Sequence, residues 1–276
     1  MNSEQLFQQI RIKQSYLCVG LDPVREKLPA AVMSSDDPVF AFNKAIIDAT
    51  APYAVAFKPN TAFYETDGSL GWATLEKTVA YIRTKYPKMF VIADAKRGDI
   101  GNTSARYAAA FFNRLGADAV TVAPYMGADS VQPFLGFDGK WVVLLALTSN
   151  TGSADFQYIE NKESLSLYKQ VIQKATQWAS PEQMMFVVGA THPDELGVIR
   201  QMAPEYFFLV PGVGAQGGDL DAVSNVGLNR RAGLLVNASR SILYASSGTD
   251  FAQKAAEEAL MIQQQMKHQL ELAKLI

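Results

Sequence analysis

Short, unbroken apolar segments alternate along the chain with longer segments in which apolar residues recur every three or four positions. The first pattern predicts strands buried on both faces, and the second predicts amphipathic helices. Eight segments fit the strand pattern: residues 16–21, 53–57, 90–93, 119–122, 141–147, 184–188, 206–210 and 233–236. The clearest predicted helices span residues 5–12, 38–49, 70–86, 105–115, 130–135, 164–178, 193–202 and 251–270.

The alternation of strands and helices predicts an α/β fold with parallel strands joined by right-handed crossovers. Eight such units favour a closed (β/α)₈ TIM barrel, whose site lies at the carboxyl ends of the strands. An open doubly wound sheet is the alternative, but no Gly-x-Gly-x-x-Gly motif follows the first strand. A length rule allows about two domains. We expect residues 1–276 to form a single barrel domain, because barrels commonly take about 250 residues.

Composition and charge narrow the classes of partner. The net charge of -2 and the pI of about 5.8 argue against a broad nucleic-acid-binding face, although a small basic pocket for one anion remains compatible. No apolar run reaches the roughly 18 residues of a membrane helix, and the polar first 15 residues do not resemble a signal peptide. The single cysteine, Cys18, excludes a disulfide framework, so we expect a cytoplasmic protein. Two histidines leave little for a zinc site.

Charged residues follow directly on the third predicted strand. Asp94 and Lys96 are two positions apart, so an extended chain points both to the same side, and Asp99 follows after a glycine. Other strand ends also carry polar residues, among them Asp22, Lys58, Ser149 with Asn150, and the stretch from Asn237 to Arg240. In a barrel these ends converge on one mouth. The alternative is a ring of salt bridges that merely closes the mouth.

A glycine-rich loop follows the seventh predicted strand. Residues 212–218 include four glycines, which let backbone N–H groups approach and face an anion. Barrels often bind phosphate after the seventh and eighth strands, and Arg240 lies just beyond the eighth, where its guanidinium can hold phosphate oxygens. An ordinary tight loop with a surface arginine is the plainer reading. The combination favours a phosphorylated small molecule.

The sequence D-A-K-R-G-D-I-G-N-T at residues 94–103 resembles the signature of the orotidine 5′-phosphate decarboxylase family. Similar blocks are F-K-P-N at 57–60, A-F-Y-E at 62–65 and P-G-V-G-A-Q-G-G at 211–218, and the longer bacterial branch fits best. The resemblance implies a (β/α)₈ barrel homodimer with shared active sites. It also implies conversion of orotidine 5′-monophosphate to UMP and CO₂, in pyrimidine synthesis, without metal or cofactor. The Asp-x-Lys-x-x-Asp core alone is shared with related sugar-phosphate barrels.

The same resemblance assigns roles to individual residues. It makes Lys96 the acid that protonates C6 as CO₂ leaves, with Asp94 against the substrate carboxylate. Lys58 and Asp22 would hold ribose hydroxyls, and Asp99 would reach into the neighbouring subunit's site. The remaining implied substrate-binding residues are Ile100 and Thr103 beside Asp99, Ser149 at the pyrimidine, and Pro211, Gln216, Gly217, Ser239 and Arg240 at the phosphate. Ser239 stands where many relatives have glycine, and a backbone N–H contact survives that change.

The chemistry agrees with these roles. Loss of CO₂ leaves a carbanion at C6 in the plane of the ring, and a fixed ammonium group stabilises it strongly in a dry site. Lysine supplies a compact charge and a proton, and neighbouring acids keep it ionised. One rival is a magnesium-dependent sugar-phosphate decarboxylase or aldolase, but Lys58 stands where its metal-binding acid would be. The other rival is a non-catalytic phosphometabolite-binding barrel. Such a protein has no need of a lysine between two acids.

Overall fold

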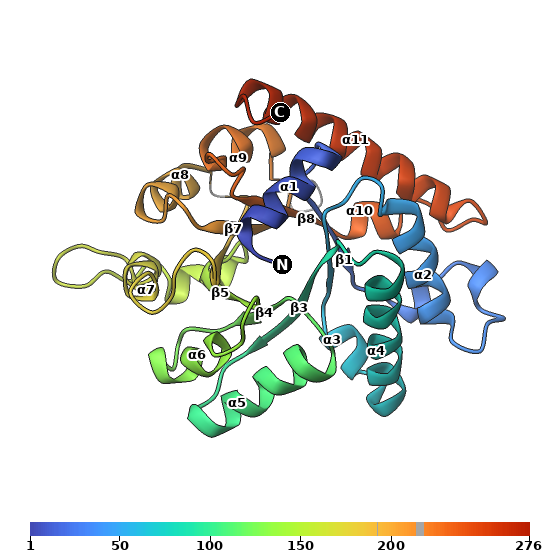
Figure 1. The fold of residues 1–276 in the computed structure, drawn as a ribbon, viewed down its shortest axis with the longest axis horizontal. Coiled ribbons are helices and arrows are strands. Elements are labelled where there is room, and N and C mark those ends of the chain that lie inside the picture. Colours follow the sequence, from blue (N-terminus) through green and yellow to red (C-terminus); the bar gives the residue numbers. More distant parts are fainter. Residues whose placement is uncertain (192, 214–217) are drawn as a thin grey trace.

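The protein is a closed barrel of eight parallel strands (Figure 1), and the predicted (β/α)₈ fold is confirmed. The computed structural model describes residues 1–276 except 192 and 214–217. The strands pair in chain order, and β8 closes the barrel on β1. They are β1 (Leu17–Leu21), β2 (Ala56–Pro59), β3 (Phe90–Arg97), β4 (Ala119–Val122), β5 (Trp141–Leu147), β6 (Met184–Val188), β7 (Phe207–Pro211) and β8 (Leu234–Ala238).

Helices surround the barrel (Figure 1). The longer ones are α1 (Ser3–Lys13), α2 (Pro38–Thr50), α4 (Gly68–Lys85), α5 (Gly101–Ala109), α6 (Ala128–Leu135), α7 (Leu167–Ala175), α8 (Pro193–Met202), α9 (Leu220–Gly227) and α11 (Phe251–Leu272). Two single turns, α3 (Ala62–Glu65) and α10 (Arg240–Leu243), follow β2 and β8. None of the helices in the described part of the chain is long and apolar enough to cross a bilayer.

Five of the strands differ from the predicted ranges, and two of them, β2 and β3, differ by three residues or more at one end. β2 begins at Ala56 rather than at residue 53, because the chain leaving α2 first makes a turn in which Tyr53 and Ala54 donate to the Thr50 carbonyl. β3 continues beyond residue 93 to Arg97, which pairs with Val122 after a shift in register. Asp94 and Lys96, which follow the predicted strand in the sequence analysis, therefore belong to β3 itself. The sequence analysis did not predict helix α9. Its eight residues follow closely on the glycine-rich loop.

Aromatic residues fill the amino-terminal end of the barrel. Phe90, Trp141 and Phe207 begin β3, β5 and β7, and all three are fully buried. The Trp141 ring packs edge to face against Phe90 and Phe207, with centroid separations of 6.0 and 6.2 Å. Side chains from alternate strands characteristically form such a layer inside a (β/α)₈ barrel.

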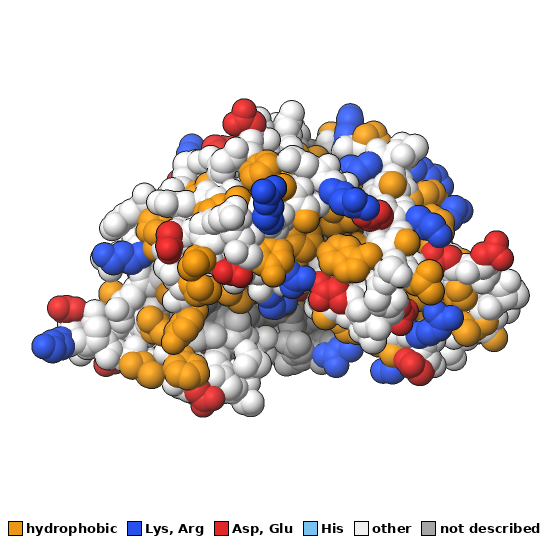
Figure 2. Space-filling view, turned by 90° about the horizontal axis from the view of Figure 1, so that it is seen from below, with side chains coloured by type: hydrophobic (Ala, Val, Ile, Leu, Met, Phe, Trp, Pro, Cys, Tyr) orange, Lys and Arg blue, Asp and Glu red, His pale blue; other side chains and the backbone are white. Residues whose placement is uncertain are grey.

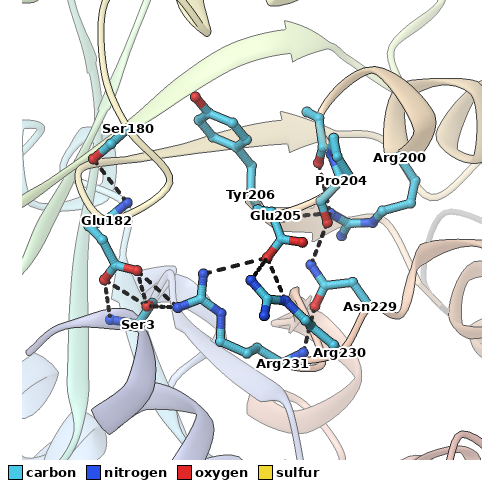
Figure 3. Close-up of polar contacts among 11 residues, drawn as sticks. Ser3, Ser180, Glu182, Arg200, Pro204, Glu205, Tyr206, Asn229, Arg230 and Arg231 are labelled. Atoms are coloured by element: carbon cyan, nitrogen blue, oxygen red, sulfur yellow. Dashed lines mark hydrogen bonds and ion pairs between the residues drawn. The ribbon is translucent and has the colours of Figure 1, made fainter.

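Helix α1 closes the same end from outside and lies across the middle of the barrel in Figure 1. It buries Leu6 and Ile10, and the Trp141 indole N–H donates to the Met1 carbonyl at 2.8 Å. Figure 3 shows how the helix is fastened: Glu182 accepts from Ser3 and pairs with Arg231 at 2.9 Å. With the amino-terminal end covered, the carboxyl ends of the strands form the open face.

A buried arginine ties the neighbouring chain segments together (Figure 3). Arg200 stacks over the Phe208 ring at 3.7 Å, and burial lowers the pKa of its guanidinium to about 9. Its N–H groups donate to five backbone carbonyls, those of Ala203, Pro204, Tyr206, Gly227 and Gly233. This arginine therefore fixes the segments that lead into β7 and β8, the two strands whose far ends approach the site.

Candidate active site

Asp94 forms the centre of the site, because two lysines converge on its carboxylate. Lys58 from β2 donates to Oδ2 at 2.9 Å, and Lys96 from the same strand as Asp94 donates to Oδ1 at 2.6 Å. The Lys58 and Asp94 side chains are only 5% and 9% exposed, whereas Lys96 is 51% exposed. The structure thus brings together three residues that the sequence predicted, with the Lys96 ammonium toward the open side.

Thr121 holds this arrangement, and sequence reasoning missed it. Its hydroxyl donates to Asp94 Oδ1 at 2.9 Å and accepts the backbone N–H of Lys96 at 2.8 Å. Lys96 has a φ of 45°, in the left-handed region that non-glycine residues rarely adopt. The sequence argument assumed an extended chain at Lys96. The structure shows that the chain is not extended there. A lone threonine in the apolar run of β4 was the available signal.

The charges at the centre reinforce one another. Burial would raise the pKa of Asp94, but the nearby Lys58 and Lys96 ammonium groups outweigh it and lower that pKa well below its usual range. Burial would likewise lower the pKa of Lys58, but attraction to Asp22 and Asp94 raises it instead. Asp94 and Lys58 are therefore both ionised at neutral pH, and each keeps the other charged.

The lowered pKa of Asp94 predicts a pH-dependent stability. A carboxyl group whose pKa is lower in the folded state stabilises the fold above its unfolded pKa of about 3.9, and the contribution is lost as pH falls through the folded pKa. Between pH 5 and pH 3, urea unfolding should show the wild-type protein losing about 1 kcal/mol more stability than Asp94→Asn. Parallel losses in the two proteins would contradict the shifted pKa.

A cavity of about 420 Å³ opens beside this centre. It brings together the predicted residues Asp22, Lys58, Asp94, Pro211, Ser239 and Arg240. The rest of its lining consists of Val24, Lys27, Asn60, Phe63, Gly212, Val213, Asn237 and Tyr244. Its size and its mixture of acidic, basic and neutral polar groups suit a small polar molecule that carries an anionic group.

The β1 end of the cavity is fixed by hydrogen bonds that sequence reasoning also missed. Asp22 accepts the backbone N–H of Asn60 at 3.2 Å, which links the ends of β1 and β2. The Tyr244 hydroxyl accepts the Val24 N–H at 2.8 Å and donates to the Asp22 carbonyl at 3.2 Å. Tyr244 therefore ties the segment after β1 to the segment after β8.

Other predicted site residues lie apart from this centre within the single chain. The Asp99 carboxylate accepts the Ile100 N–H at 2.7 Å, and within the described residues it forms no ion pair. Ile100 and Thr103 are exposed at the start of α5. Ser149 lines a separate hollow after β5, with Asn150 and Glu195. Gln216 and Gly217 lie outside the described residues.

No group of three or more metal-binding side chains gathers in the described ranges 1–191, 193–213 and 218–276. The site instead combines a buried carboxylate, two ammonium groups and an arginine that begins α10 after β8. Fold and site together define a (β/α)₈ barrel protein with a lysine–aspartate centre beside a polar cavity that Arg240 lines.

Comparison with known proteins places the chain within that class. Residues 15–255 match the model of the orotidine 5′-phosphate decarboxylase / HUMPS family. The orotidine 5′-phosphate decarboxylase of Phocaeicola vulgatus is 56% identical over 267 residues, which are 97% of this chain and 98% of the relative. That of Porphyromonas gingivalis is 55% identical over the full length of both chains. The solved structure of Leishmania donovani OMP decarboxylase is 39% identical, with a TM-score of 0.79 over 95% of this chain and 99% of that one. The chain therefore belongs to the orotidine 5′-phosphate decarboxylase / HUMPS family.

Proposed function

We propose that the protein carries out the reaction for which its relatives are named, the decarboxylation of orotidine 5′-monophosphate to UMP, and that Lys96 protonates C6. The observation that carries the role of Lys96 is its 2.6 Å contact with Asp94, an acid that Lys58 also holds at 2.9 Å. This pairing fixes an ammonium group at the carboxyl ends of the strands, where barrel enzymes bind their substrates.

In the reaction, the bond between C6 and the carboxyl carbon breaks, CO₂ leaves, and the electron pair remains on C6. The Lys96 ammonium stabilises that charge and then transfers a proton to C6, which completes UMP. Lys96 is half exposed, so solvent can return the proton after UMP leaves. Asp94 stays ionised throughout, because Lys58 remains beside it. No step needs a metal or an organic cofactor.

The cavity supports the remaining contacts with the nucleotide. Asp22 and Lys58 would hold ribose hydroxyls at the ends of β1 and β2. Arg240, the backbone at Ser239 and the glycine-rich loop after Pro211 would hold the phosphate. Ser149 would contact the pyrimidine from the neighbouring hollow. Because the phosphate lies far from the reacting bond, its binding energy would act by ordering the loops of the mouth.

A homodimer with shared sites is part of the proposal. Large apolar side chains stand exposed around the mouth after β3, β4 and β5, namely Ile100, Tyr125, Met126, Phe156 and Ile159. Figure 2 shows hydrophobic side chains interspersed with charged ones on the side of α5 and α6. A second subunit on this surface would cover them and bring its own Asp99, Ile100 and Thr103 to the first subunit's cavity.

Two further parts of the proposal concern the whole chain. All eight strands belong to one barrel, which supports a single domain over residues 1–276. Cys18 is buried with a free thiol, and burial raises the pKa of that thiol to about 12, so it resists oxidation. A reduced thiol is compatible with the cytoplasm, where pyrimidine synthesis would use the enzyme.

The direct test is the ultraviolet change on conversion of orotidine 5′-monophosphate to UMP by the purified protein in EDTA. We expect full activity, because the proposed chemistry uses the chain's own ammonium group. Loss of activity in EDTA with recovery on adding Mg²⁺ would instead favour the metal-dependent sugar-phosphate rival. Binding of UMP without any turnover would favour the non-catalytic barrel.

A further inference from the structure

Asn237 and Ser239 form a polar pair at the end of β8, the Asn237–Ser239 pair. Both line the cavity that contains Asp22 and Lys58. The Asn237 amide nitrogen donates to the Ser239 hydroxyl oxygen at 3.1 Å. Asn237 is only 9% exposed as a residue, and its buried carboxamide oxygen has no hydrogen-bond partner.

An unpaired buried acceptor is unusual, because most buried polar atoms find a partner. Four such side-chain atoms occur in the described part of the chain: Asn43 Oδ1, Ser166 Oγ, Arg231 Nε and Asn237 Oδ1. Of these four residues, Asn237 lines the cavity, and the others lie elsewhere. Its unpaired oxygen therefore marks a position at which a bound molecule can supply the missing donor.

The pair presents two complementary groups to such a molecule. A serine hydroxyl can accept one hydrogen bond while donating its own proton. Ser239 accepts from Asn237, and nothing among the described residues accepts the Ser239 proton. One free donor and one free acceptor, held side by side, match a ligand hydroxyl group, which also donates once and accepts.

The position of Ser239 indicates which part of the nucleotide supplies this hydroxyl group. A Cβ atom added to Gly20 would lie 1.8 Å from Ser239 Oγ and 3.2 Å from Asp22 Oδ2. The missing side chain at Gly20 thus makes room for the Ser239 hydroxyl beside the Asp22 carboxylate. A phosphate dianion and a carboxylate carry no proton to donate to Asn237. The pyrimidine ring also has an N–H donor, but the proposed function places that ring at Ser149 in the separate hollow after β5, so the ribose is the matching part of the nucleotide.

We propose that the Asn237–Ser239 pair binds a ribose hydroxyl of the nucleotide. The hydroxyl donates to Asn237 Oδ1 and accepts from Ser239 Oγ. This inference rests on the proposed function, because it takes a nucleoside monophosphate as the ligand. It gives Ser239 a side-chain role in addition to the backbone contact with phosphate, and it makes Asn237 a substrate-binding residue.

The test compares the affinities of UMP, 2′-deoxy-UMP and 3′-deoxy-UMP, measured by titration calorimetry on the wild type, Asn237→Leu and Ser239→Ala. Leucine keeps the approximate shape of asparagine without its polar atoms. Each variant should weaken UMP binding about tenfold. For the analogue that lacks the contacted hydroxyl, the same variants should change affinity less than about twofold, because that contact is already absent.

Asn43→Leu is the matched control. Asn43 also has an unpaired buried oxygen, but it does not line the cavity and donates to Tyr64 and Thr78. The Asn43→Leu variant should leave the ratio of UMP to deoxy-UMP affinities unchanged, even if its melting temperature falls.

The inference would be overturned if the two cavity variants, Asn237→Leu and Ser239→Ala, weakened the binding of all three nucleotides equally or did not weaken it. If Asn237→Leu fails to fold, Ser239→Ala alone decides. Failure of the wild type to bind UMP would instead reject the proposed function.

Discussion

Replacing Lys96 with alanine is expected to reduce decarboxylation by about 10⁴-fold or more, while UMP binding stays measurable. The variant removes both the proton donor and the charge that stabilises the C6 carbanion. General acid catalysis typically contributes about 10²–10⁴-fold, and removal of one fixed electrostatic donor costs about 10²–10³-fold. Binding should survive, because the cavity residues proposed to hold ribose and phosphate come from other strand ends. Single-turnover decay of substrate absorbance and calorimetry with UMP measure the two effects separately.

Two further variants sharpen that experiment. Lys96→Arg keeps a positive charge but replaces the compact donor with a group that does not lose its proton, so it should remain nearly inactive. Lys254→Ala removes a lysine that pairs with Glu257 on the distant helix α11, and it should retain full activity. Substantial turnover by Lys96→Ala would show that another group protonates C6.

Much of the barrel follows from its apolar runs. β4, β5 and β6 have the predicted bounds, because each is a buried strand whose apolar residues have no reason to alternate. The convergence of Asp94, Lys96 and Lys58 also follows from sequence, because parallel strands direct their carboxyl ends to one face.

The local backbone of the centre could not be predicted in the same way. The left-handed conformation of Lys96 depends on the Thr121 hydroxyl of the neighbouring strand, a contact that no pattern within β3 encodes. The role proposed for Asn237 depends on the Ser239 side chain that pairs with it and on the space left at Gly20. Both features also depend on the pairing of neighbouring strands, β3 with β4 and β8 with β1.

The single chain also leaves the predicted pair of acids around Lys96 incomplete. Asp94 is the acid that pairs with Lys96 in the described residues, whereas the Asp99 carboxylate accepts from the backbone of its own loop. Asp99 is partly exposed and the adjacent Ile100 is exposed, where the chain leaves β3 for α5. If a second subunit packs there, its Asp99 supplies the second acid. The sequence argument for a lysine between two acids therefore becomes an argument for a dimer.

Mixing two inactive variants is expected to restore about a quarter of the wild-type activity. In the proposed dimer, Asp99→Ala would remove the acid that each chain lends to its neighbour, and Arg240→Ala would remove a phosphate contact within each chain's own cavity. Random exchange makes about half of the dimers mixed. In a mixed dimer, the cavity of the Asp99→Ala chain keeps its own Arg240 and receives Asp99 from the other chain, so one of the two sites is intact. The other site carries both defects.

The measurement is the steady-state rate after the two variants are denatured together and refolded, compared with each variant refolded alone. Joint refolding guarantees exchange of subunits, so absence of recovery has one meaning. As a control, Asp99→Ala refolded with a chain that carries both Asp99→Ala and Arg240→Ala should show no recovery, because no chain in that mixture can lend Asp99. Recovery in the first mixture but not in the second requires that Asp99 act across the subunit boundary. No recovery in either would place Asp99 in the site of its own chain and remove the reason for a shared site.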